Sequence, residues 1–351
     1  MGIKIILLII FFAVMAAVGI YSRRHVTSVD GFVLGGRSVG PWLTAFAYGT
    51  SYFSAVVFVG YAGQFGWKYG IASTWIGIGN ALIGSLLAWV VLGRRTKVMT
   101  QHLGSRTMPD FFGERYKSKS LKITASVIVF VFLIPYTASV YNGLSRLFAM
   151  AFNIPYTWCV VTMAAFTALY VILGGYMATA INDFIQGIIM LIGIVAVIAA
   201  VLNGQGGFMN AIAEMAKIPS DVPLTQGQPG AFTSFFGPDP VNLLGVVLLT
   251  SLGTWGLPQM IGKFYAIKDE KSISTGTIIS TIFAIIISGG CYFLGGFGRL
   301  FDSPEIYDKA GGAVVYDSII PHMLSMLPDL LIGVVVVLVL SASMSTLSSL
   351  C

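Results

Sequence analysis

The sequence predicts an all-α integral membrane protein with nine transmembrane helices, from its composition and from the spacing of its apolar stretches. Charged residues make up 10% of the 351 positions and apolar residues 56%, and the mean hydropathy is +0.86. Because an ordinary soluble domain carries roughly 25% charged residues, a soluble fold is excluded. A closed barrel would show short alternating strands, whereas this chain repeats apolar stretches of about 20 residues, the length that crosses a bilayer. The expected spans are residues 4–21, 42–65, 70–92, 121–150, 157–174, 176–202, 241–263, 273–296 and 329–350.

The first span is expected to be a retained helix. Lys4 precedes its apolar run, as in a signal peptide, but the basic pair Arg23 and Arg24 follows the run. No convincing A-x-A cleavage site stands before that pair, so the features of a cleaved signal are incomplete.

Basic residues gather in three loops, which predicts the orientation of the chain. With the N-terminus outside, residues 22–41, 93–120 and 264–272 lie in the cytoplasm. Together with Lys122 and Lys263 at adjoining helix ends, these loops hold 14 of the 20 Lys and Arg residues. This positive-inside bias predicts a multi-pass protein of the plasma or inner membrane, and it explains the net charge of +6 without a nucleic-acid partner. The longer segments expected outside are residues 203–240 and 297–328.

The second and seventh spans differ from the others because small and hydroxyl residues interrupt their middles. The interruptions read Tyr48-Gly-Thr-Ser-Tyr-Phe-Ser54 and Thr250-Ser-Leu-Gly-Thr-Trp-Gly-Leu-Pro258. Non-helical backbone at membrane depth survives only where protein or a water-lined cavity satisfies it. The two spans are five apart, the offset of inverted-topology repeats, in which substrate and ions bind where the broken helices meet. For either helix alone, close helix packing through small residues is an equally good explanation.

The ninth span ends in a dense stripe of hydroxyls, six within residues 341–349. Helical periodicity places Ser341, Ser345, Ser348 and Ser349 on one face, with Thr346 beside it. Neutral oxygens of this kind suit a small hard cation. Interhelical hydrogen bonds are the alternative, but the density of hydroxyls favours an ion site.

Asp183 is the only acidic residue placed well inside a predicted span. A carboxylate at that depth costs about 2.5–3.5 kcal/mol even on the gentler insertion scale. A bound cation, a proton relay or a nearby basic partner would account for it, and snorkelling to the interface is the alternative. The functional interpretation is favoured, and a proton in place of sodium stays open.

No enzyme or cofactor chemistry is indicated. The sequence has no nucleophile–base pair, metal-ligand cluster or phosphate-binding loop, and the glycine pairs Gly35-Gly36 and Gly174-Gly175 lack the spacing of a nucleotide fingerprint. The histidines, all in expected loops, are His25, His102 and His322. The cysteines, expected to be apolar packing residues, are Cys159, Cys291 and Cys351.

Five segments together resemble, in order, those of one transporter family. They are Phe32-Val-Leu-Gly-Gly-Arg37, Thr50 to Gly63, Gly174-Gly-Tyr-Met-Ala-Thr-Ala-Ile-Asn-Asp-Phe-Ile-Gln186, Gly256-Leu-Pro-Gln259 and Met344-Ser-Thr-Leu-Ser348. The family is the sodium:solute symporter family, which contains sodium-driven proline, pantothenate, sialic acid and sugar carriers. The resemblance covers the whole chain and implies an inverted-repeat, five-plus-five transporter fold with an extra N-terminal helix at 1–21 and a first repeat at 42–202.

The resemblance also implies a sodium site between the broken second span and the ninth. Its ligands would be the carbonyls of Thr50, Phe53 and Ala342 and the hydroxyls of Ser345 and Thr346. Some members bind a second sodium ion, and the matching residues here are Asp183, Ser348 and Ser349.

The implied solute site agrees less well with the proline carriers. Ser54 and Tyr136 keep their pattern, whereas Tyr52 stands where those carriers have an aspartate, and Thr250 and Thr254 stand where they have aromatic residues. The sequence therefore implies a small organic solute without favouring proline.

The chain is shorter than the fold that it resembles. It ends at Cys351, eight helices into a ten-helix core. The single transporter domain, 1–351, is therefore expected to be incomplete, with only a partial second repeat at 241–351, and the chain is expected to be a fragment of a longer parent.

The sequence thus predicts a secondary active transporter that works by alternating access. Sodium moving inward would carry with it a small organic solute of the amino acid, vitamin or carboxylate class. The expected partners are that solute, sodium and the lipid bilayer, with no obligate protein partner evident. The alternatives are a passive channel or facilitator and a truncated fragment that does not transport.

Overall fold

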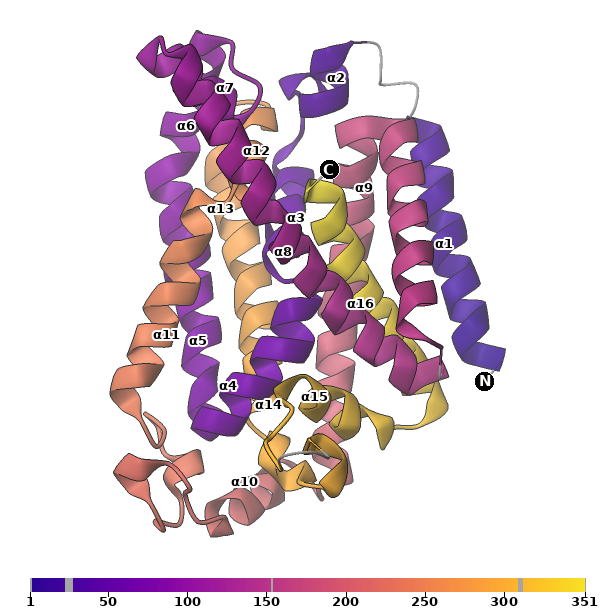
Figure 1. The fold of residues 1–351 in the computed structure, drawn as a ribbon, viewed down its shortest axis with the longest axis vertical. Coiled ribbons are helices and arrows are strands. Elements are labelled where there is room, and N and C mark those ends of the chain that lie inside the picture. Colours follow the sequence, from indigo (N-terminus) through magenta and orange to yellow (C-terminus); the bar gives the residue numbers. More distant parts are fainter. Residues whose placement is uncertain (1, 23–27, 153, 309–311, 351) are drawn as a thin grey trace.

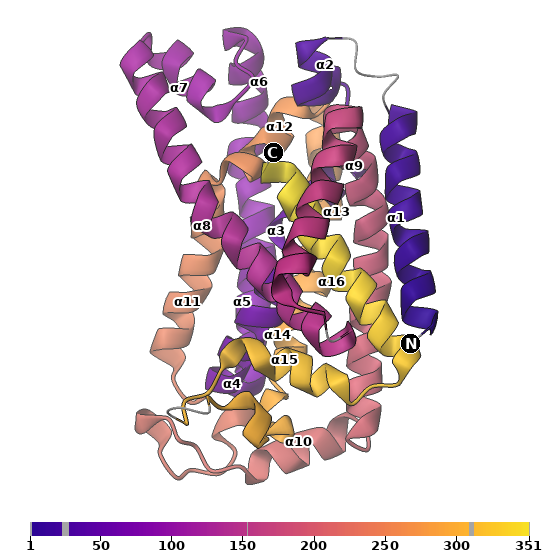
Figure 2. The same cartoon turned by 45° about the vertical axis from the view of Figure 1, so that its right-hand side comes forward.

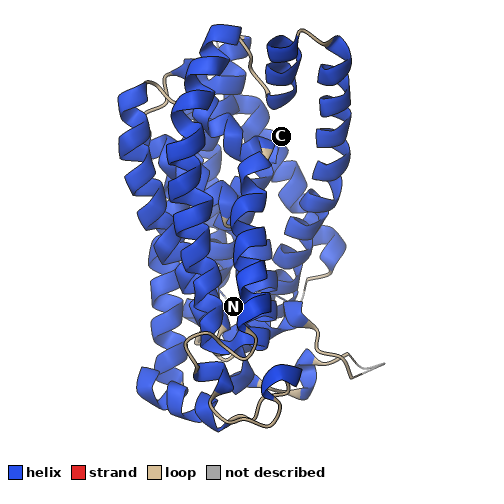
Figure 3. Cartoon of the chain, turned by 90° about the vertical axis from the view of Figure 1, so that its left-hand side faces the viewer, coloured by secondary structure: helices blue, strands red, loops and turns tan. Residues whose placement is uncertain are grey.

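The chain folds into a bundle of helices. A computed structural model describes residues 2–22, 28–152, 154–308 and 312–350, and within these ranges it contains helices and two isolated β-bridges but no strand. The long helices run between two ends of the molecule, where the loops and short helices gather (Figures 1 and 3).

The helices follow one another in a simple order. The first half contains α1 (Gly2–Ser22), α2 (Val29–Leu34), α3 (Pro41–Tyr52), a π-helical segment (Val56–Tyr61), α4 (Ala62–Tyr69), α5 (Thr74–Gly79), π-helical segments at Asn80–Leu87 and Trp89–Gly93, α6 (Arg94–Leu103), α7 (Met108–Tyr116), α8 (Lys119–Phe152) and α9 (Tyr156–Gly204). The second half contains α10 (Phe208–Lys217), α11 (Pro240–Leu252), a 3-10 turn (Gly253–Gly256), α12 (Pro258–Ala266), α13 (Glu270–Ala284), a π-helical segment (Ile285–Gly289), α14 (Gly290–Gly295), α15 (Tyr316–Ser325) and α16 (Asp329–Leu350).

Each of the nine predicted spans falls on helix. Six continuous helical stretches within the described ranges are long and apolar enough to cross a membrane, and the bent pair formed by α11 and α12 makes a seventh. One of these stretches, Val56–Leu103, contains a reversal of the chain and so covers parts of two predicted spans. The protein is therefore a membrane protein.

Two glycines make the sharpest reversals. Gly70 (φ 60°, ψ −142°) ends α4 before the chain turns back into α5, and Gly175 (φ 55°, ψ −152°) divides α9 into two legs. Both lie in a region of backbone space that only glycine enters readily. Figure 2 shows the two legs of α9 meeting near α2.

The helices α3 and α16 lie in the interior of the bundle. The helix α3 packs against α9, α12, α13 and α16, and α16 packs in addition against α1 and α8. Side chains of α16 from Val335 to Ser348 are all buried, whereas α8 exposes large apolar side chains such as Phe130 and Phe132. The hydroxyl stripe therefore lies in the core.

The described parts of the three basic loops, which include α2, α6 and α7, share one end of the molecule, while α10 and α15 lie at the other end (Figure 1). Polar contacts join these loops: Arg37 Nη2 donates to Ser105 O at 2.7 Å, and Lys97 donates to Ile267 O. Arg94 forms an ion pair with Glu270 at 2.5 Å. The segments 203–240 and 297–328, expected on the opposite side, are at the opposite end.

Candidate functional site

The second predicted span is broken where the sequence analysis expected it. The helix α3 ends at Tyr52, and Phe53 leaves the helical region (φ −105°, ψ 87°). Ser54 begins the next segment, because its carbonyl accepts from Val57 N at 3.0 Å and from Phe58 N at 3.1 Å. The last carbonyls of a helix have no partner within that helix, so the break provides backbone oxygens in the protein interior.

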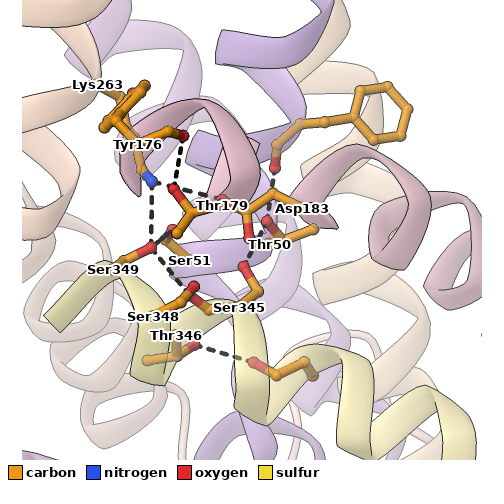
Figure 4. Close-up of polar contacts among 12 residues, drawn as sticks. Thr50, Ser51, Tyr176, Thr179, Asp183, Lys263, Ser345, Thr346, Ser348 and Ser349 are labelled. Carbon is orange, nitrogen blue, oxygen red and sulfur yellow. Dashed lines mark hydrogen bonds and ion pairs between the residues drawn. The ribbon is translucent and has the colours of Figure 1, made fainter. Parts of the chain in front are cut away.

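The hydroxyl stripe of α16 lies against this break. Ser345 Oγ donates to Thr50 Oγ1 at 2.8 Å, and Thr50 Oγ1 donates to Phe46 O at 2.8 Å (Figure 4). On the same helix, Thr346 Oγ1 donates to Ala342 O at 3.1 Å. All of these side chains are buried.

Phe53 and Ala342 complete this group across a small cavity. Both residues line a space of about 10 Å³ together with Ser54, and its other walls are apolar side chains that include Met190, Ile287 and Leu338. Thr50 and Ser345 are thus in contact, and Phe53 and Ala342 line one small space, while the Thr346 hydroxyl bonds within α16. Hydroxyl and carbonyl oxygens are ligands that suit a small hard cation, and these residues offer both kinds.

Asp183 lies in the second leg of α9 and has a basic partner. Its side chain is 0% exposed, and its Oδ2 lies 3.5 Å from Nζ of Lys263 in α12, whose side chain is 4% exposed. Complete burial excludes snorkelling to the interface. A nearby basic partner, one of the explanations that the sequence left open for this carboxylate, is present in the structure.

Lys263 also contacts α16 and α9. Its Nζ donates to Ser349 Oγ at 3.1 Å and lies 5.4 Å from the centre of the Tyr176 ring. Ser349 Oγ in turn lies 2.7 Å from Ser51 Oγ. Figure 4 shows the ammonium group between Asp183 and Ser349, the residues predicted to help bind a second sodium ion. The third of them, Ser348, donates to Ser345 O at 2.9 Å.

The residues expected to bind the solute also come together. Tyr52 donates from its hydroxyl to Thr250 O at 3.0 Å, across from α3 to α11. Thr254 and Tyr136 are further polar neighbours of Tyr52, and Ser54 is a neighbour of the Tyr136 hydroxyl. The second broken span, bent by 52° between α11 and α12, thus meets the first at these side chains.

A cleft of about 500 Å³ is lined by residues of the basic loops and reaches Lys263, Ser348 and Ser349. Phe32 and Arg106 lie among its outer lining residues, and Gln259, Lys263 and Ser349 among its inner ones. Within the described ranges it is the larger of the two pockets named here, and it is large enough for a small organic solute.

Sequence reasoning missed the roles of Lys263, Ser51 and Gln259. Lys263 counted only as a helix-end member of a basic loop, and no single-sequence signal pairs it with Asp183, 80 positions earlier. Gln259 follows the helix-breaking Pro258, and neither atom of its buried amide has a hydrogen-bond partner among the described residues. Because Gln259 follows a proline in the middle of a predicted span, the sequence could have marked it as a candidate site residue.

The cysteines and histidines, for which the sequence indicates no chemical role, can be followed only in part. Cys291 is buried in the apolar core, while Cys159's side chain and Cys351 lie outside what the structure describes. His25 also lies outside the described residues, and His322 Nδ1 lies 3.1 Å from Glu305 Oε2. Among the described residues, no group of three or more His, Cys, Asp or Glu side chains is placed to hold a metal ion.

Comparison with known proteins shows the family of this chain. The model of the sodium:solute symporter family matches residues 32–351. Sodium/proline symporter 2 of Staphylococcus saprophyticus is 32% identical over 356 residues, covering 98% of this chain and 65% of that protein. The sodium/proline symporter of Staphylococcus aureus strain JH9 is 30% identical over 355 residues, with the same coverage. The chain therefore spans about 65% of the length of these curated relatives.

A solved structure has a similar fold. It is the substrate-bound, outward-open state of a Na⁺-coupled sialic acid symporter, which aligns with a TM-score of 0.79 over 99% of this chain and 71% of the other. The two sequences are 16% identical over the alignment, so the likeness concerns the fold.

Proposed function

The chain belongs to the sodium:solute symporter family, and we propose that it carries a small organic solute across the membrane together with sodium. The observation that carries this proposal is the contact of Ser345 with Thr50 at the break in α3. It joins a hydroxyl-rich helix to the end of α3 in the interior. The ligands would be the carbonyls of Thr50, Phe53 and Ala342 and the hydroxyls of Ser345 and Thr346.

The same break couples the ion to the solute. Phe53, a proposed sodium ligand, stands between Tyr52 and Ser54, two proposed solute contacts. A sodium ion that holds α3 against α16 therefore also fixes the backbone that presents these two side chains. Such coupling is reciprocal, so bound solute raises the affinity for sodium by the same factor.

The solute class that we propose is an amino acid, a vitamin or a carboxylate. Two of the relatives compared here are named sodium/proline symporters. This chain offers tyrosine and threonine hydroxyls to a solute at Tyr52, Thr250 and Thr254. Tyr136 and Ser54 complete the proposed solute site.

Transport would proceed by alternating access in an inverted-repeat fold. Residues 1–21 would form the extra helix, 42–202 the first repeat and 241–351 part of the second repeat. The broken helices α3 and α11–α12 would meet at the centre of that arrangement. In the plasma membrane, with the N-terminus outside, the basic loops face the cytoplasm. Inward movement of one sodium ion then provides about 2.3 kcal/mol per 100 mV of membrane potential.

The test is uptake by proteoliposomes that contain the protein, with a panel of labelled amino acids, vitamins and carboxylates. We expect one class to accumulate above its outside concentration when an inward sodium gradient is imposed. Replacing sodium by choline should abolish that accumulation. Any longer parent chain is assayed beside the 351-residue chain.

Two results would contradict the proposal. Uptake that is equal in choline and in sodium buffer would show that transport does not depend on sodium. Equilibration without accumulation would indicate a passive channel or facilitator, because only coupling to a gradient moves a solute uphill.

A further inference from the structure

We propose that the ammonium group of Lys263 takes the place of a second sodium ion, so that the protein binds one sodium ion per chain. This inference rests on the proposed function above and deepens it by giving the ion stoichiometry. The residues expected to form a second sodium site are Asp183, Ser348 and Ser349. Lys263 contacts the first and the last of them.

The position of Lys263 is the first argument. Its Nζ lies 3.5 Å from Asp183 Oδ2 and donates to Ser349 Oγ at 3.1 Å, so one ammonium group touches oxygens from α9 and from α16. A cation in that site would make these two contacts. Lys263 reaches the site from α12, the helix that follows the break in the seventh span.

Charge is the second argument. Asp183 is fully buried, and its polar neighbours are the Lys263 ammonium and the Ser345 hydroxyl. Such a group needs a positive charge close by. An ammonium group carries one positive charge and three donors, so it already neutralises Asp183. A sodium ion that entered beside it would meet a like charge in a region of low dielectric.

The residues of the proposed first sodium site, the neighbour of this site on α16, have no charged side chain. Lys263 has its ion pair with Asp183 and its hydrogen bond with Ser349, whereas Thr50 and Ser345 contact each other through neutral hydroxyls. One site therefore contains a cation that is part of the chain and cannot be transported. The other needs a cation from solution, and each transport cycle moves that single ion.

The test is equilibrium binding of radioactive sodium (²²Na⁺) to the purified protein at pH 8, counted per chain. We expect one ion for the wild type and one for Lys263→Arg, which keeps the charge. We expect two for Lys263→Gln, because Asp183 then lacks its partner and recruits sodium. In Asp183→Asn with Lys263→Gln, both charges are gone, and the count should return to one.

Several outcomes would overturn the inference. They are two ions in the wild type, one ion in a folded Lys263→Gln protein, or fewer ions in the double variant than in the wild type. Wild-type protein that binds no sodium would instead overturn the proposed function itself. If Lys263→Gln does not fold, the membrane potential at which wild-type transport reverses still gives the number of sodium ions. One and two sodium ions per solute predict different reversal potentials.

Discussion

Two neighbouring sites on α16 differ in one property, the source of their positive charge. Ser345 meets Thr50 through neutral hydroxyls at 2.8 Å, whereas Ser349, about one turn later, accepts from the Lys263 ammonium that is paired with Asp183. Both sites are buried and both bring α16 against other helices. Neutral oxygens can bind a cation from solution and release it again, whereas the Lys263 ammonium is part of the chain and stays in place. If the proposed sodium site is right, the first site binds an exchangeable cation and the second holds one that is part of the chain.

Breaking the charge pair should have the largest effect on stability. Asp183→Asn or Lys263→Gln alone leaves one buried charge without its partner, and such a loss typically costs about 3–5 kcal/mol. The double variant removes both charges and should lose much less. Thermal unfolding in sodium-free detergent buffer, analysed as a double-mutant cycle, measures the difference. If the two single effects simply add in the double variant, the pair is not coupled.

Removing the neutral oxygens should act on sodium rather than on stability. Ser345→Ala with Thr346→Ala deletes two proposed sodium ligands, and the sodium concentration for half-maximal uptake should rise at least about tenfold, equivalent to about 1.4 kcal/mol. Ser343→Ala is the matched control, because Ser343 is buried on the same helix and donates to Val339 O at 2.7 Å. An equal rise in the control would show that the effect is one of helix packing.

A substitution in the proposed solute site should weaken solute binding and leave both cation sites as they are. Tyr52→Phe removes the hydroxyl that donates to Thr250 O at 3.0 Å, a bond typically worth about 0.5–1.5 kcal/mol. We expect the solute concentration for half-maximal uptake to rise a fewfold at saturating sodium. The number of bound sodium ions should stay the same. A changed sodium count would place Tyr52 in the ion site instead.

Much of the candidate site could be predicted because its residues are close in sequence or have unusual composition. The six hydroxyls at 341–349 and the breaks near Phe53 and Pro258 stand out in an apolar chain. Asp183 stands out for the same reason, since a carboxylate at membrane depth needs an explanation. The family resemblance, confirmed by the match over residues 32–351, then related these segments to one another.

What the sequence by itself determined is the class of protein, the places of its membrane helices and the end at which its basic loops gather, because these depend on local apolarity and on the distribution of charge. Only the tertiary structure decided which partner Asp183 has. The ammonium of Lys263 reaches it from α12, and the contact depends on how α9 and α12 pack across the bundle. The energy of a buried charge is set by the atoms around it in space, and their distances are not encoded in the local pattern of either helix.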